Sequence, residues 1–99
     1  MKMARVVGRV VCSRQCPGIT GKKLLLIEPL NWDDGKPSGD PFVAADCVGA
    51  GSAEKVFFVQ SREALVAFQG FDGDTAAQEI LPPVDAAIVG IIDGLQVNL

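Results

Sequence analysis

Short runs of apolar residues, separated by polar segments, follow one another along the whole chain. Over residues 4–12 the even positions form one face of Ala, Val, Gly and Cys, while the odd positions mix Arg with Val. That spacing of two is typical of a strand. The apolar runs at 24–27, 42–45, 56–59 and 84–92 are short and are bounded by turn-forming residues. With the alternating residues 95–99, they predict a mainly β protein.

One segment carries helical signals instead. Ser61 is predicted as the N-cap of a short helix over residues 62–69, which Gly70 would end. Thr75 and Gln78 have the spacing of a capping box and predict a further helical turn before the prolines at 82 and 83.

A long polar connection, residues 31–41, separates two of the predicted strands. Asp34-Gly35 within it predicts a hairpin turn. Trp32 at its start is expected to cover the rim of the fold rather than to stack on a ligand.

These elements predict one domain over residues 1–99: a small, OB-like, five-stranded antiparallel barrel, partly open, with one short helix. The runs 24–27 and 84–92 are apolar on both faces, which a small barrel with a solvated outer surface does not require. Hydrophobic residues make up 48% of the 99 residues and charged residues only 21%. That is more apolar material than a small monomer can easily bury, so we expect the chain to form oligomers.

The glycine-rich segment Val48-Gly49-Ala50-Gly51-Ser52 joins two of the apolar runs. It could serve as a turn, as a phosphate cradle, or as a place where several chains approach closely, since glycine allows tight curvature and close backbone contact. The residues that follow the loop argue against a phosphate-binding site. Neither a helix N-terminus nor a Lys-Ser/Thr pair follows the loop.

Charge and composition argue against several classes of function. Nine basic and twelve acidic residues give a net charge of −3, and Lys22-Lys23 is the only adjacent basic pair, so a nucleic-acid partner is not expected. There is no histidine and no tyrosine. The carboxylates Asp46, Glu54, Asp85 and Asp93 form no recognisable acid dyad, so neither catalytic residues nor a cofactor are predicted. An OB-type binding module for single-stranded nucleic acid or oligosaccharide stays open as the alternative function.

The three cysteines, Cys12, Cys16 and Cys47, lack the spacing of a zinc site, and no histidine is present to complete one. We expect them to be reduced and free of metal. Their odd number and the absence of a signal-peptide pattern fit a cytoplasmic protein, and no apolar run is long enough to cross a membrane.

Two blocks of sequence together resemble the EutN/CcmL family of bacterial microcompartment vertex proteins. They are Asp-x-Val-Gly-Ala-Gly at residues 46–51 and Val-Asp-Ala-Ala-Ile-Val-Gly-Ile-Ile-Asp at residues 84–93, supported by segments 4–11 and 21–27. Family members usually have a glycine just before the glutamate that follows the glycine-rich loop, where this chain has Ala53 before Glu54.

The resemblance implies a structural protein without enzymatic activity, a homopentamer that caps the five-fold corners of a shell in the cytoplasm. Its partners would be further copies of itself and hexameric or trimeric shell proteins. The loop Val48, Gly49, Ala50, Gly51 and Ser52 would lie near the five-fold axis, where only small residues let five backbones meet. The candidates for the subunit interface are Leu25, Ile27, Asp46, Glu54, Asp85, Ile88 and Ile91.

Overall fold

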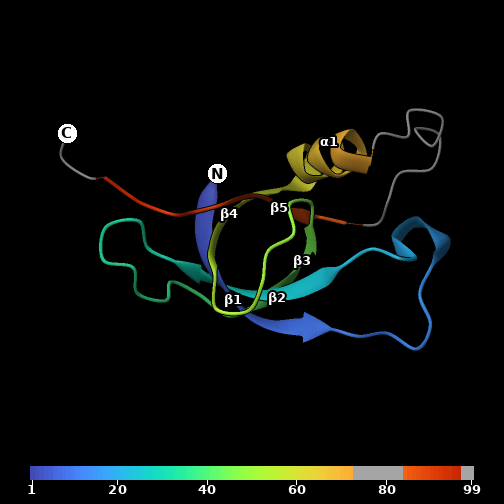
Figure 1. The fold of residues 1–99 in the computed structure, drawn as a ribbon, viewed down its shortest axis with the longest axis horizontal. Coiled ribbons are helices and arrows are strands. Elements are labelled where there is room, and N and C mark those ends of the chain that lie inside the picture. The colour runs from blue at the N-terminus through green and yellow to red at the C-terminus, as the bar shows by residue number, and fades with distance from the viewer. Residues whose placement is uncertain (73–83, 97–99) are drawn as a thin grey trace.

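The computed structural model describes residues 1–72 and 84–96 of the chain (Figure 1). Five strands, one α-helix and one 3-10 helix follow in this order: β1 (Lys2–Val10), η1 (Pro17–Ile19), β2 (Leu24–Leu30), β3 (Phe42–Asp46), β4 (Lys55–Gln60), α1 (Ser61–Asp72) and β5 (Ala86–Ile91). The helix α1 packs against β4 and β5 at one end of the strands.

The strands close into a barrel in the order β1-β2-β3-β5-β4. The predicted five-stranded barrel with one short helix is confirmed, but two details differ. The barrel is closed rather than partly open, and β5 runs parallel to β3. The second difference follows from the first, because neighbours around a closed ring of five strands cannot all alternate in direction. β5 enters between β3 and β4, pairs antiparallel with β4 and is therefore parallel to β3.

The core lies inside the barrel and is built from the inward-facing positions of all five strands. Its largest fully buried side chains include Phe58, Ile27, Ile88 and Val6. The ring of Phe42 contacts that of Phe58 edge to face, with centroids 5.2 Å apart and planes at 69°. Edge-to-face contact is one of the preferred geometries for aromatic pairs, and here it joins β3 and β4 across the barrel.

A β-bulge interrupts the alternation predicted for the first strand. Val6 pairs with Ile27 and Gly8 with Leu26, so Val7 is an extra residue without a partner. Beyond this bulge the inward-facing and outward-facing positions of β1 are exchanged. Gly8 pairs with Leu26, which faces outward because it lies between the core residues Leu25 and Ile27. The alternation predicted over residues 4–12 therefore holds only as far as Val6. The strand also ends at Val10, so Cys12 lies outside it.

A second bulge lies in β5, where Phe57 pairs with Gly90 and Phe58 with Ile88, leaving Val89 as the extra residue. The Phe57 ring lies over Gly90. A Cβ atom on Gly90 would come within 2.1 Å of the ring. Gly90 is therefore the place where the strand leaves room for an aromatic ring.

The connection from β2 to β3 folds back as a short hairpin. The Asn31 amide donates to the Lys36 carbonyl at 2.8 Å, and Gly35 adopts a φ of +70°. The predicted Asp34-Gly35 turn is thus confirmed. Trp32 at its start is 42% exposed.

The helix begins at Ser61 itself and continues through Gly70 to Asp72, so it is longer than predicted. Ser61 has a φ of +58°, and its amide donates to the Asp85 carbonyl at 2.7 Å, which lets β4 lead directly into the helix. The last strand is shorter than predicted and begins at Ala86. Leu95 and Gln96 are not in a strand, and the helical turn predicted at residues 75–78 lies outside the described residues.

Candidate functional site

The loop between β3 and β4, residues 47–54, is held by the carboxylate of Asp46 at its start. Asp46 Oδ1 accepts hydrogen bonds from the amides of Val48 and Gly49, both at 3.1 Å. Gly49 has a φ of +83°, a conformation that a residue with a Cβ atom rarely adopts. The Asp46 side chain is only 2% exposed. A buried carboxylate needs such partners, so Asp46 and the loop amides stabilise one another.

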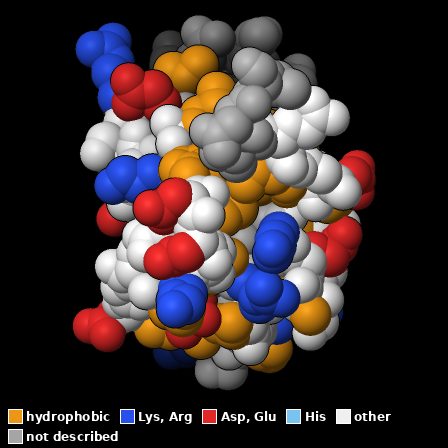
Figure 2. Space-filling view, turned by 90° about the vertical axis from the view of Figure 1, so that its left-hand side faces the viewer, with side chains coloured by type: hydrophobic (Ala, Val, Ile, Leu, Met, Phe, Trp, Pro, Cys, Tyr) orange, Lys and Arg blue, Asp and Glu red, His pale blue; other side chains and the backbone are white. Residues whose placement is uncertain are grey.

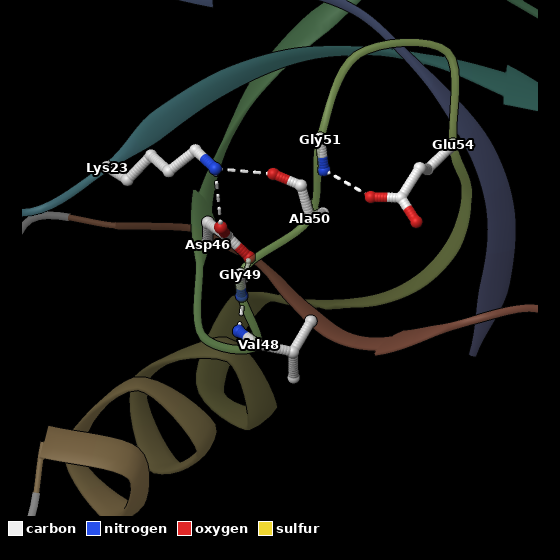
Figure 3. A network of polar contacts seen from close by, with 7 residues as sticks. All are labelled: Lys23, Asp46, Val48, Gly49, Ala50, Gly51 and Glu54. Atoms are coloured by element: carbon white, nitrogen blue, oxygen red, sulfur yellow. Dashed lines mark hydrogen bonds and ion pairs between the residues drawn. The ribbon is translucent and has the colours of Figure 1, made fainter.

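Lys23 supplies the positive charge opposite Asp46. Its Nζ lies 3.5 Å from Asp46 Oδ2 and donates to the Ala50 carbonyl at 2.5 Å (Figure 3). Lys23 comes just before β2, whereas Asp46 ends β3 and Ala50 lies at the middle of the loop. One ammonium group therefore joins three segments of the chain. The sequence reasoning did not select Lys23, because its partners come from segments distant in the sequence.

The other half of the loop is closed by Glu54. Its Oε1 accepts from the Gly51 amide at 2.5 Å, and its own amide donates to the Gly51 carbonyl at 3.3 Å (Figure 3). The Ala53 amide then donates to the Val6 carbonyl at 2.9 Å, and the Val6 amide to the Glu54 carbonyl at 3.0 Å. The loop is thus tied to β1 as well, and it presents one defined conformation.

The five residues predicted for the axis loop differ in their exposure. Ala50 is fully buried and belongs to the core, and Val48 packs against that core. Gly49 and Ser52 are exposed, and Gly51 is half-buried. The loop therefore covers part of the core with Ala50 and presents Gly49 and Ser52 to the outside.

The residues predicted for the subunit interface are divided between the core and the loop network. Leu25, Ile27 and Ile88 are buried in the core, and Ile91 packs against it. Asp46 and Glu54 bind the loop from within the chain. The Asp85 side chain is exposed, with its backbone carbonyl bound to the Ser61 amide.

The buried positions cannot offer their side chains to a neighbouring subunit, because they fill the barrel of their own chain. On β2 the outward positions are Leu24 and Leu26, which are half-buried. Leu26 pairs with Val43 of β3, which is 42% exposed. These three form the outer apolar face of β2 and β3. The prediction that the run 24–27 is apolar on both sides of the strand holds.

Apolar side chains also reach the surface elsewhere. Figure 2 views the molecule from the left-hand side of Figure 1 and shows a band of hydrophobic side chains between acidic and basic ones. A groove of about 440 Å³ lies between the helix and the barrel, lined by Met1, Val59, Arg62, Glu63, Val66, Ala67 and Val89. Val66 within it is 64% exposed.

The described residues offer little for chemistry. They contain no group of three or more His, Cys, Asp or Glu side chains that could hold a metal ion. Cys12 and Cys16 are exposed, Cys47 is half-buried, and none of the three is in a disulfide. In residues 1–72 and 84–96, no helix is long and apolar enough to cross a membrane.

The family model described as ethanolamine utilisation protein EutN/carboxysome matches residues 1–93. The chain belongs to the EutN/CcmL family. The shell vertex protein EutN of Salmonella typhimurium is 36% identical over 93 residues, which cover 94% of this chain and 84% of that protein. The carboxysome shell vertex protein CcmL of Synechocystis is 38% identical over 97 residues, covering 98% and 87% of the two chains.

A solved structure agrees with these relatives. The GrpN pentameric microcompartment shell protein from Rhodospirillum rubrum superposes with a TM-score of 0.79 at 29% identity, covering 98% of this chain and 99% of that one. The EutN/CcmL family consists of structural shell vertex proteins rather than enzymes, as the sequence blocks indicated. The alternative of an OB-type binding module is not favoured.

Proposed function

We propose that this EutN/CcmL chain assembles as a homopentamer that caps the vertices of a bacterial microcompartment shell. The observation that carries the proposal is the family match over residues 1–93, together with a pentameric structural neighbour over nearly the whole chain. Its partners in the shell are hexameric or trimeric shell proteins, and the shell lies in the cytoplasm. The role of the chain is structural, since a five-fold corner requires a closed ring of five subunits.

The loop of residues 48–52 lies near the five-fold axis in this proposal. Two features support that position. Gly49 and Ser52 at its surface are small, and small residues let backbones from several chains approach closely. The contacts of Asp46, Lys23 and Glu54 hold the loop in one conformation before any assembly, so little conformational entropy is lost when five copies meet.

The outer apolar face of β2 and β3 forms one side of the subunit contact. A cyclic ring uses heterologous contacts, so each chain presents two different surfaces to its two neighbours. Leu24, Leu26 and Val43 supply an apolar surface that the chain leaves partly in water. Asp85 remains a candidate for the same contact, because its exposed side chain borders the cavity that Leu24 and Val43 also line.

A mass measurement in solution tests the assembly. The wild-type protein should elute and scatter light as a species of five times the 10.4 kDa chain mass at micromolar concentration. Val43→Lys places a charge on the proposed contact surface and should shift the protein to smaller species while its β-sheet circular dichroism is retained. Val11→Lys is the matched control, since Val11 is 85% exposed in the segment after β1 and should tolerate the charge.

Two outcomes would contradict the proposal. A wild-type protein that is a stable monomer would exclude the pentamer. A Val43→Lys protein that remains a pentamer would exclude the outer apolar face of β2 and β3 from the subunit contact.

A further inference from the structure

We propose that the cleft between the 48–52 loop and the adjoining ends of β1 and β2 binds a small organic carboxylate. The cleft has a volume of about 250 Å³ and is lined by Val6, Gly8, Arg9, Lys23, Leu25, Ala50, Gly51 and Ser52. The inference rests on the hydrogen-bond donors that these residues leave unused, on the charge of the cleft and on its apolar floor.

Donors are in excess in this cleft. Arg9 carries five N–H donors, and no acceptor among the described residues is bonded to them. The Lys23 ammonium has three donors, of which one is bonded to the Ala50 carbonyl and one faces Asp46. The third remains available. Ser52 adds an exposed hydroxyl to the lining.

The acceptors nearby are already used. The Ala50 carbonyl accepts from Lys23, and the Gly51 carbonyl accepts from the Glu54 amide. The carboxylates of Asp46 and Glu54 are bound to loop amides, and neither residue lines the cleft (Figure 3). In a chain of net charge −3, the cleft therefore collects two cations and no carboxylate among its lining residues. Lys23 already faces Asp46, so the Arg9 guanidinium is the charge in the cleft that a bound anion would balance.

The floor of the cleft restricts the kind of anion. Val6, Leu25 and Ala50 are at most 3% exposed and present only apolar surface. With a volume of about 250 Å³, the cleft has room for one small molecule. A short-chain carboxylate fits this combination, with its alkyl part on the floor and its two oxygens toward Arg9 and Lys23. Arginine binds the paired oxygens of a carboxylate through two parallel hydrogen bonds.

All residues that line the cleft belong to one chain. If the loop does lie at the axis, as proposed above, five such clefts surround it. The cleft would then be a place where a small anion associates with the vertex.

A titration of the full-length protein with sodium acetate tests the site. We expect saturable shifts of the Gly51 and Ser52 amide resonances and of the Arg9 side-chain N–H, with a dissociation constant in the millimolar range, as suits a ligand of so few atoms.

Arg9→Gln should weaken binding about tenfold, because it removes a charge-assisted hydrogen bond. Arg14→Gln is the matched control. It makes the same change of charge at an exposed residue outside the cleft and should leave the affinity unchanged. Acetamide, of the same shape but neutral, should not saturate the site.

Other results would overturn the proposal. Equal weakening by both substitutions would mean that acetate follows the general charge of the surface. Shifts that grow linearly without saturation would mean that no site exists. If wild-type protein fails to bind acetate while Arg9→Gln lowers the oligomer mass, then Arg9 pairs with a carboxylate of a neighbouring chain instead. The oligomer mass is measured separately from acetate binding. A protein that does not bind acetate can therefore still be a pentamer, and a protein that is not a pentamer can still bind acetate.

Discussion

At the scale of single residues, Ala53 is a position where the backbone is strained. The φ of Ala53 is +66°, which lies in the left-handed region that favours glycine. A left-handed conformation costs an L-residue about 1–2 kcal/mol because Cβ approaches the following carbonyl. The strain persists because the Ala53 amide is bound to the Val6 carbonyl and the neighbouring Glu54 carbonyl to the Val6 amide.

Replacing Ala53 with glycine should therefore stabilise the protein. The relief of strain exceeds the extra chain entropy of glycine, so we expect Ala53→Gly to raise the free energy of unfolding by about 0.5–1 kcal/mol. Urea denaturation at a fixed protein concentration measures this. Ala67→Gly makes the same chemical change inside α1 and should lower the stability by about 1 kcal/mol. A loss of stability in Ala53→Gly would show that the backbone is not strained at this position.

Gly90 is a second constrained residue, because the structure leaves no room for a side chain at this position. A Cβ atom there would lie 2.1–2.9 Å from three atoms of the Phe57 ring, so the ring would have to move. We expect Gly90→Ala to cost about 1–3 kcal/mol, as overpacking does. The control is Gly94→Ala, where a Cβ atom would meet nothing within 4 Å, and it should change the stability by less than about 0.5 kcal/mol.

The contact with Phe57 can be separated from other effects by a second substitution. Phe57→Leu in the Gly90→Ala background should recover part of the lost stability, because the smaller side chain leaves room for the new methyl group. If the two substitutions simply add, the ring is not the cause of the loss.

At the scale of elements, the loop between β3 and β4 is organised by one buried carboxylate. Asp46 Oδ1 holds two loop amides, and Oδ2 faces Lys23, which itself holds the Ala50 carbonyl. Lys23 and Ala50 are 27 residues apart in the sequence. The conformation of the loop therefore depends on the closure of the barrel as well as on its glycines.

The charge of Asp46 can be tested by a substitution that keeps its shape. In Asp46→Asn one oxygen can still accept from the Val48 and Gly49 amides, but the new amide group donates toward the Lys23 ammonium. We expect a loss of about 1–3 kcal/mol in stability, since a buried donor is left facing a cation. Faster hydrogen exchange of the two loop amides should accompany it. Asp40→Asn is the control at an exposed position and should have little effect. Equal effects of the two variants would remove Asp46 from its organising role.

At the scale of the whole molecule, the barrel closes on itself and still leaves apolar surface outside. Closure removes the free strand edges on which sheets aggregate, so contacts between copies must use faces rather than edges. The outward Leu24, Leu26 and Val43, and the groove beside α1, are such faces. This agrees with the high apolar content of a short chain and with the proposed ring of subunits.

The sequence by itself determined most of the local structure. Short apolar runs located β2, β3 and β4, the Asp34-Gly35 pair located the hairpin, and Ser61 marked the start of the helix within one residue. Each of these features depends on neighbours a few positions away, where turn chemistry and side-chain spacing act directly. The two sequence blocks were also enough to recognise the family, because family membership is a property of sequence.

Only the tertiary structure decided how those elements meet. The extra residues Val7 and Val89 are set by strand pairing, and they change which side chains face the core. The parallel pairing of β3 with β5 follows from closing a ring of five strands. The approach of Lys23 to Asp46 and Ala50, and the burial of Ala50, require segments distant in sequence to be brought together. Local patterns carry no information on such contacts, because register and closure arise from the packing of the whole chain.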